Sequence, residues 1–182
     1  QWGSFCRLGA VVFGRSIMYL GLNTFIVLYF MNHFHESQNF SNLLLSVYYG
    51  IGALFTLIGG KMGDKHGYRT FVRLGFLLAF PAALILAWTD SSILGILCLI
   101  ILGAALNLTY SPMVVLGQQY LPNRVGLASG ITLGLAVSVG GITAPLLGKV
   151  GDMYGLETTF YVIALITLIP LISSFTLPKP KK

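Results

Sequence analysis

Six long apolar stretches alternate with short polar stretches along this chain. Their approximate bounds are 8–31, 42–60, 70–88, 93–115, 126–147 and 158–176. A helix needs about 20 mostly apolar residues to cross a bilayer, whereas a barrel strand needs only about 9–11 alternating ones. The pattern therefore predicts an all-α membrane protein in which six transmembrane helices form a single bundle over residues 1–182.

The composition is typical of a membrane protein. Hydrophobic residues make up 55% of it and charged residues only 9%, compared with about 25% charged residues in soluble domains. The basic residues lie in short connections and form no continuous face, so we expect no nucleic-acid partner. Cys6 and Cys98 show no metal or redox spacing, and we expect both thiols to be free and buried.

The Lys and Arg residues indicate the orientation, because cytoplasmic loops of membrane proteins are enriched in them. If six helices alternate, nine cations fall on the side that carries both chain ends: Arg7, Lys61, Lys65, Arg69, Arg73, Arg124, Lys179, Lys181 and Lys182. The opposite connections contain one cation, Lys149, and four acids. We therefore expect both ends of this chain to be cytoplasmic.

A short string occurs twice, as GKMGDKHG at 60–67 and as GKVGDMYG at 148–155. Other residues match at the same offset of 88, among them Gly52 with Gly140 and Thr70 with Thr158. The repeating unit is then three helices, about 8–90 and 93–178. Because three is odd, the second unit is predicted to be inverted, as in many secondary transporters. Chance similarity between two glycine-rich helix ends is the alternative.

The first string and the residues after it resemble the cytoplasmic signature of the major facilitator superfamily, G-x-x-x-D-[RK]-x-G-x-[RK]. Its positions are occupied by Gly60, Asp64, Lys65, Gly67 and Arg69. The resemblance implies a fold of twelve helices in two inverted-repeat halves, of which this chain would be the C-terminal half, with the N-terminal half absent. The stretches GQQYLPNRVGLASGI and LGLAVSVGGITAPLLG are most similar to the fosmidomycin-resistance group of bacterial exporters.

One polar stripe crosses the first predicted helix. It consists of Arg15, Tyr19 and Asn23, which are spaced four residues apart. An Arg near a helix centre costs at least about 2.5 kcal/mol, so it is expected to face a cavity or a partner. The alternative is that Arg15 extends along the helix to the cytoplasmic interface.

The fourth predicted helix carries a matching stripe, and the resemblance implies that both helices line a central cavity. The predicted wall of that cavity is Arg15, Tyr19, Asn23, Asn107, Tyr110 and Ser111. A cationic, hydroxyl-rich wall suits an anionic or polar solute. The alternative is hydrogen bonding between helices with no solute, worth about 0.6 kcal/mol per pair.

Small residues recur on the fifth predicted helix, where they let backbones approach closely. They include Gly130, Gly134, Gly140, Gly141 and Pro145. In a transporter such a face would rock against the other half. The segment GGITAPLLG resembles the antiporter signature of the superfamily, with Ala144 in place of one glycine. Ordinary close packing explains the same residues.

The signature string is expected to turn the chain sharply at its glycines and to act as a conformational latch. Asp64 would accept hydrogen bonds from the start of a neighbouring helix, and Lys65 and Arg69 would hold the inside orientation. A plain positive loop is the alternative. The two histidines and Glu36 of the segment 33–36 could bind a metal, but we expect an exposed polar loop.

The sequence thus predicts a transporter of the bacterial inner membrane and no enzyme, metal or cofactor. The expected activity is efflux of a drug or small organic anion by alternating access. Proton coupling is implied by the resemblance alone, because no carboxylate lies inside the six apolar stretches. Uptake or exchange of a metabolite anion, and a six-helix scaffold without transport activity, are the alternatives.

Overall fold

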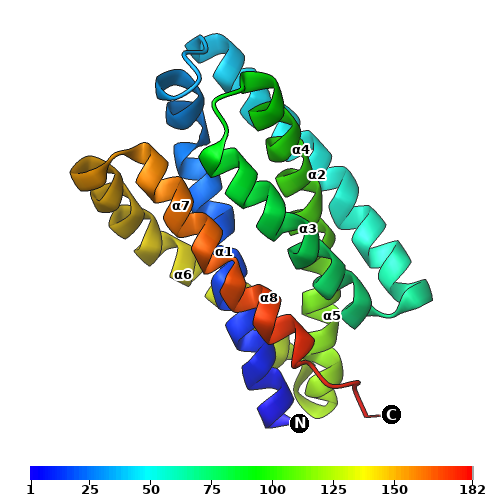
Figure 1. Ribbon diagram of the computed structural model, residues 1–182. Coiled ribbons are helices and arrows are strands. Elements are labelled where there is room, and N and C mark those ends of the chain that lie inside the picture. Colours follow the sequence, from blue (N-terminus) through cyan, green and yellow to red (C-terminus); the bar gives the residue numbers. More distant parts are fainter. Residues whose placement is uncertain (182) are drawn as a thin grey trace.

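Residues 1–181 are described by a computed structural model, and this part of the chain is built from helices without a strand (Figure 1). The elements are α1 (Trp2–Asn32), α2 (Gln38–His66), α3 (Tyr68–Trp88), α4 (Ser92–Leu108), α5 (Tyr110–Tyr120), the 3-10 helix η1 (Pro122–Arg124), α6 (Val125–Tyr154), α7 (Leu156–Ile166) and α8 (Leu168–Phe175). Six helical segments are long and apolar enough to cross a membrane. The prediction of six membrane helices is confirmed.

The helices extend well beyond the apolar stretches. α1 begins at Trp2, whereas the first apolar stretch begins near residue 8. α2 continues to His66, whereas the second apolar stretch ends near residue 60. Helices of 29 to 31 residues rise about 1.5 Å per residue and are therefore longer than the hydrocarbon core is thick. Polar residues at their ends continue the helix outside that core, where hydropathy gives no signal.

Two of the six segments contain a break that the apolar pattern did not predict. The fourth is divided into α4 and α5 at Thr109, and the sixth into α7 and α8 at Thr167. A proline follows each break by three residues, Pro112 and Pro170. Because proline lacks an N–H, it removes one bond of the helical ladder. Both threonine hydroxyls donate to a carbonyl of the preceding turn, at 2.7 and 3.1 Å.

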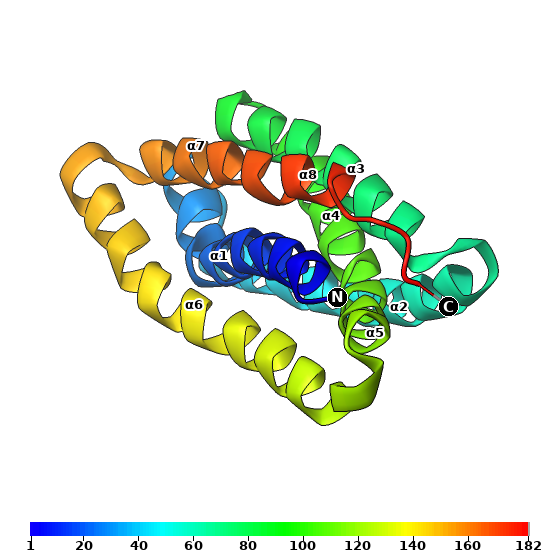
Figure 2. The ribbon, with the colours of Figure 1, turned by 90° about the horizontal axis from the view of Figure 1, so that it is seen from below.

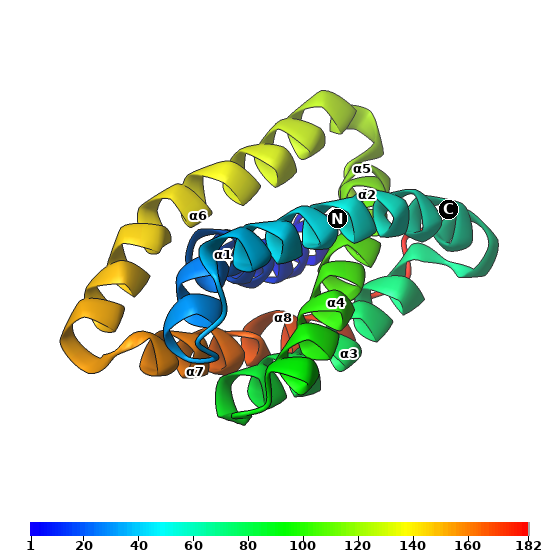
Figure 3. The same ribbon diagram turned by 90° about the horizontal axis from the view of Figure 1, so that it is seen from above.

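α1 lies in the middle of the bundle. Seen from below and from above, it is surrounded by α6, by the α7–α8 pair, by α4 and by α2 (Figures 2 and 3). About half of its residues are buried, a much larger share than in α2 or α6. Within residues 1–181, α2 and α6 do not contact each other. Their apolar outer faces are left without a protein neighbour in this part of the chain.

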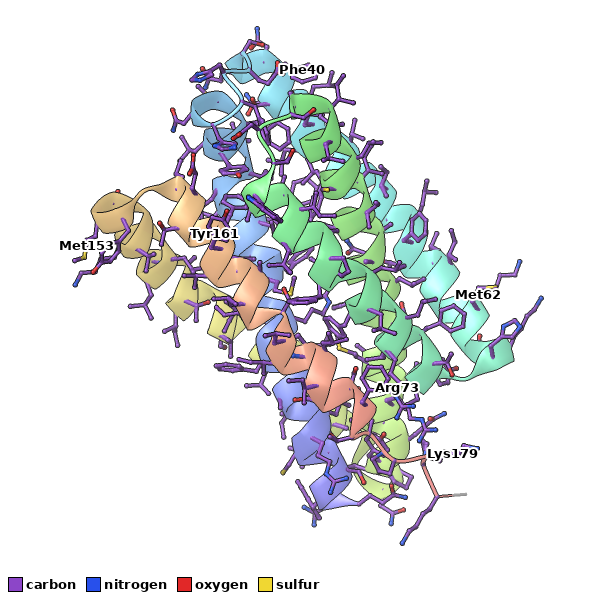
Figure 4. All side chains as sticks on the ribbon, viewed as in Figure 1. Phe40, Met62, Arg73, Met153, Tyr161 and Lys179 are labelled. Carbon is purple, nitrogen blue, oxygen red and sulfur yellow. The ribbon has the colours of Figure 1, made fainter. Side chains whose placement is uncertain are left out.

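The two ends of the bundle differ in charge, and Figure 4 labels Arg73 and Lys179 near the end that carries the termini. At one end Arg7, Arg69 and Arg73 donate to backbone carbonyls at the end of α8. Both chain termini lie at this end (Figure 1). At the opposite end Glu157 and Asp90 lie close to the end of α1.

The turn at the end of the first string spans fewer residues than predicted. The segment 60–66 continues α2 as regular helix, and the chain reverses only at Gly67, where φ is +93°. Gly155, which lies 88 residues further on, has φ of +95°. Both glycines donate their N–H to the carbonyl four residues back, at 2.9 and 2.8 Å. The inverted relation of the two three-helix units stays a prediction.

The two thiols are free, as predicted, but only one of them is buried. Cys98 lies inside α4, whereas Cys6 is exposed on the first turns of α1. The prediction for Cys6 is therefore wrong. The beginning of α1 extends past the bundle core, so that an apolar sequence there does not imply burial.

Candidate functional site

A cavity of about 320 Å³ lies between α1, α2, α6 and the α4–α5 break. Its lining residues are Arg15, Tyr19, Leu20, Thr56, Asn107, Tyr110, Ala136 and Val137. Small-molecule sites in proteins are mostly apolar clefts of about 300–1,000 Å³ with a few polar groups. This cavity falls in that range, and its polar groups come from four helices, α1, α2, α4 and α5.

Arg15 is the charged group of this cavity. The side chain is buried, and its Nε atom donates to the carbonyl oxygen of Leu106 at 3.0 Å. The guanidinium lies over the rings of Tyr19 and Tyr110, 5.0 and 4.9 Å from their centroids. Its side chain therefore stays among the helices and does not extend to the end of the bundle.

Within residues 1–181, Arg15 has no carboxylate within 4.0 Å and no hydrogen bond from its terminal nitrogens. A buried guanidinium carries a full positive charge and five N–H donors. The two tyrosine faces stabilise this charge in part through their quadrupoles. The remaining donors are available to an acceptor in the cavity, and an anionic group would complement them best.

The break between α4 and α5 provides the carbonyl that holds Arg15. The Leu106 oxygen accepts from both Arg15 and the Thr109 hydroxyl. Pro112 has no N–H for the Leu108 oxygen four residues earlier. Gly59 of α2 lies against that oxygen so closely that an added Cβ would be 2.3 Å from it. The sequence therefore breaks the helix at the cavity and packs a glycine against the exposed backbone.

The structure brings together four of the six predicted wall residues. Arg15, Tyr19, Asn107 and Tyr110 line the cavity. Asn23 lies one turn further along α1, and its buried Oδ1 atom has no partner within residues 1–181. Ser111 donates to the Thr56 carbonyl at 3.1 Å and does not line the cavity.

Sequence reasoning missed several residues of this region. Leu20, Ala136 and Val137 line the cavity through apolar atoms, for which no polar pattern exists. Tyr48 of α2 is buried, its ring lies 6.5 Å from that of Tyr19, and its hydroxyl has no partner within residues 1–181. A tyrosine inside an apolar stretch was the available signal for Tyr48.

The signature residues lie at the end of the bundle that carries the termini, away from the cavity. Asp64 accepts a hydrogen bond from the hydroxyl of Tyr68, the first residue of α3. The expected partner was the backbone at the start of a helix, so the contact is at the right place but through a side chain. Arg69 donates to the Leu177 carbonyl at 3.1 Å. A Cβ added at Gly60 would lie 3.6 Å from the Ser111 Cβ atom. Lys65 is exposed.

The small residues of α6 divide into two groups. Gly140 packs against Leu20 of α1 so tightly that an added Cβ would overlap that side chain. Gly130, Gly134 and Gly141 have open space around them, and Pro145 is exposed. Of the five predicted residues, only Gly140 therefore serves packing within residues 1–181, and the other four lie on the uncovered face of α6.

A comparison with models of protein families identifies the family of this six-helix bundle. Residues 8–182 match the family model described as Major Facilitator Superfamily. The chain belongs to the major facilitator superfamily. It is a multi-pass membrane protein with the fold of a transporter of that family.

Two relatives from bacteria share about a third of the residues with this superfamily member. An uncharacterized MFS-type transporter, YfnC of Bacillus subtilis (strain 168), is 34% identical over 163 residues, which cover 88% of this chain and 39% of that protein. The fosmidomycin resistance protein of Escherichia coli (strain K12) is 31% identical over 166 residues, which cover 91% of this chain and 40% of that protein. The chain thus spans less than half the length of either relative.

The fold is also that of solved transporters of the superfamily. The crystal structure of FucP in the outward conformation superposes with a TM-score of 0.85 over 97% of this chain and 42% of FucP, at 17% identity. At this level of identity the likeness concerns the fold alone. Among residues 1–181 no group of three His, Cys, Asp or Glu side chains could hold a metal ion.

Proposed function

We propose that this chain is the C-terminal half of a bacterial inner-membrane transporter that exports a drug or small organic anion by alternating access. The observation that carries the proposal is Arg15, a buried guanidinium that faces a cavity and has no acid partner within residues 1–181. Burying a charge is costly unless something pairs with it, and an anionic solute would supply that pair in the transport cycle.

The uncovered faces of α2 and α6 support the proposal that a second six-helix half packs against this chain. These two helices flank the cavity, and their outward side chains are apolar, such as Leu57 of α2 and Val137 of α6. A second six-helix unit placed across these faces would close the cavity between the two halves. Sites of secondary transporters lie at such repeat interfaces near the bilayer midplane.

The direction of transport and the coupling ion rest on the relatives. The fosmidomycin resistance protein favours efflux, and protons are the proposed driving ion. The described carboxylates lie at or near helix ends, for example Asp64 and Asp152. A proton-coupling acid at the midplane would then come from the rest of the protein. Both proposed cytoplasmic termini follow from the cations gathered at their end of the bundle.

The test is a flux assay on the full-length transporter, produced in a drug-susceptible bacterium with fosmidomycin as the probe. We expect Arg15→Ala to lower export at least about tenfold, equivalent to about 1.4 kcal/mol. Arg15→Lys keeps the charge but loses the planar stacking and the Nε bond, and an intermediate loss is expected. Arg124→Ala, which removes an arginine outside the cavity, serves as the matched control.

Membrane levels and elution as a single species are measured for each variant, so that a folding defect is recognised. A second variant, Tyr110→Phe, keeps the ring beside Arg15 but removes the hydroxyl from the cavity wall, and a smaller loss is expected. Export by Arg15→Ala equal to wild type would reject Arg15 as a site residue. Accumulation in place of export would favour uptake, and no flux of the probe in either direction would contradict the proposal for this solute.

A further inference from the structure

A histidine joins three helices at the end of the bundle opposite the termini. His33 is the residue directly after α1. Its Nδ1 atom lies 2.7 Å from the Glu157 Oε1 atom in the first turn of α7, and its Nε2 atom lies 2.8 Å from the Thr89 carbonyl oxygen at the end of α3. The side chain of His33 is only 10% exposed. The three helix ends therefore meet at one imidazole ring.

Both ring nitrogens of His33 face oxygen atoms that accept hydrogen bonds. A backbone carbonyl has no proton to donate, and an ionised carboxylate has none either. A neutral imidazole carries a single N–H, so it can satisfy only one of the two contacts. The other contact would place two lone pairs 2.7 or 2.8 Å apart. The observed geometry needs one additional proton, shared between His33 and Glu157.

A second carboxylate and a tyrosine ring also lie against this imidazole. The Asp90 Oδ1 atom lies 3.5 Å from Nε2, which adds a second carboxylate. The Tyr29 ring of α1 stacks on the imidazole, with centroids 4.8 Å apart and planes 8° apart. Tyr154 at the end of α6 lines a surface pocket together with His33 and Glu157. Within residues 1–181, neither Glu157 nor Asp90 forms an ion pair with a Lys or Arg.

We propose that His33 and Glu157 form a proton-binding site that fastens the start of α7 to the ends of α1 and α3. With the proton bound, the imidazolium donates to Glu157 and to Thr89, and the three ends are held together. When the proton leaves, one donor is lost, and the carboxylate faces a bare nitrogen lone pair. The start of α7 then separates from the other two ends.

Protons can reach this site from the aqueous phase. The Glu157 side chain is 62% exposed, and His33 and Glu157 line a pocket of about 360 Å³ at the bundle surface. This end lies opposite the end proposed to be cytoplasmic, so the site samples the pH outside the cell. The proton site would exist whether or not any solute is transported.

The distance between α3 and α7 measures the site directly. Spin labels are placed at Trp88→Cys and Tyr161→Cys, two exposed positions, in the full-length protein in lipid nanodiscs. Exposed native cysteines such as Cys6 are replaced by Ser. We expect the label distance to increase when the pH is raised from about 5.5 to about 8.5, the range in which histidine changes its charge.

Glu157→Gln separates the proton from the hydrogen bond. The Gln amide can donate to the Nδ1 atom of a neutral ring, while Nε2–H donates to Thr89. We expect this variant to keep the short distance at both pH values. His66→Gln, a change at the other end of the bundle, should leave the response unchanged. A wild-type distance that does not depend on pH overturns the proposal, and so does an unchanged pH response in Glu157→Gln.

Discussion

Arg15 shows how much one side chain decides in a membrane protein. Its position near the middle of α1 is costly in lipid, and the structure reduces that cost with the Leu106 carbonyl and two tyrosine rings. These contacts stabilise the cation without neutralising it. A residue with this environment is available for a negative partner, and a residue bound to a carboxylate would not be.

The chain reverses direction at two glycines with positive φ, and substitution of either is expected to destabilise the protein. Gly67 and Gly155 have φ values of +93° and +95°, which side chains with a Cβ rarely adopt. Such strained backbone costs about 1–3 kcal/mol per residue. We expect Gly67→Ala and Gly155→Ala each to lower the midpoint of thermal unfolding of the purified protein.

Gly9→Ala is the matched control for these two variants. Gly9 lies within α1 and has nothing within 4 Å of an added Cβ. An alanine in a helix is favoured over glycine by about 0.5–1 kcal/mol, so this variant is expected to be as stable as wild type or more so. Equal thermal midpoints for Gly9→Ala and Gly67→Ala would contradict the role given to the positive φ.

At the scale of the elements, the α4–α5 break is enclosed by glycines of two neighbouring helices. An added Cβ at Gly52 would lie 2.6 Å from the Asn107 amide, and one at Gly75 would lie 2.2 Å from Thr109. Together with Gly59 they let α2 and α3 approach the segment where the helix is interrupted. Close approach thus shields backbone groups that the proline leaves without a helical partner.

Two adjacent glycines of α2 offer a test of this packing. At Gly59 a Cβ would lie 2.3 Å from the Leu108 carbonyl oxygen, whereas at Gly60 it would lie an ordinary 3.6 Å from Ser111. Overpacking against backbone costs about 1–3 kcal/mol. We expect Gly59→Ala to lower the thermal unfolding midpoint and Gly60→Ala to leave it nearly unchanged. The reverse order of the two midpoints would show that the close contact at Gly59 has no structural weight.

The sequence predicted the six membrane helices because long apolar stretches have few alternatives in a bilayer. It did not predict where those helices end, since polar helix ends such as 61–66 read as a loop. The breaks at Thr109 and Thr167 depend on a proline together with a threonine, and Pro81 lies inside α3 without a break. A proline alone was therefore an insufficient signal.

The candidate site was predicted in part, through its polar side chains. The four-residue spacing on α1 identified Arg15 and Tyr19, and the matching stripe identified Asn107 and Tyr110. The contribution of α6 could not be predicted, because Ala136 and Val137 are typical of any apolar helix. The bond from Arg15 to Leu106 depends on a backbone carbonyl, which no residue type reveals.

On the scale of the whole molecule, the end of α8 is held by arginines from α1 and α3. Arg73 donates through Nε to the Ser174 carbonyl at 3.1 Å and through Nη2 to the Phe175 carbonyl at 3.0 Å. Carbonyls at a helix C-terminus lack partners within the helix, and a cation there is favourable. These contacts connect the last helix to α3.

Arg73→Gln is expected to loosen this end of the molecule. The shorter amide cannot bridge several carbonyls, and hydrogen bonds to charged donors contribute about 1.5–3 kcal/mol. We expect amide hydrogen exchange in residues 171–177 to become about tenfold faster, as measured by mass spectrometry. Arg124→Gln is the control, because the Arg124 side chain lies over the Trp2 ring and forms no hydrogen bond within residues 1–181. Equal exchange in the two variants would count against Arg73 as the cap.

The position of both termini at one end of the bundle has a consequence for how larger proteins can be built from this unit. Six crossings are an even number, so the chain returns to the side from which it started. A second such unit can be joined in tandem through a connection that never enters the lipid, and it keeps the same orientation as the first. Parity alone would allow a gene fusion to create a longer membrane protein in a single step.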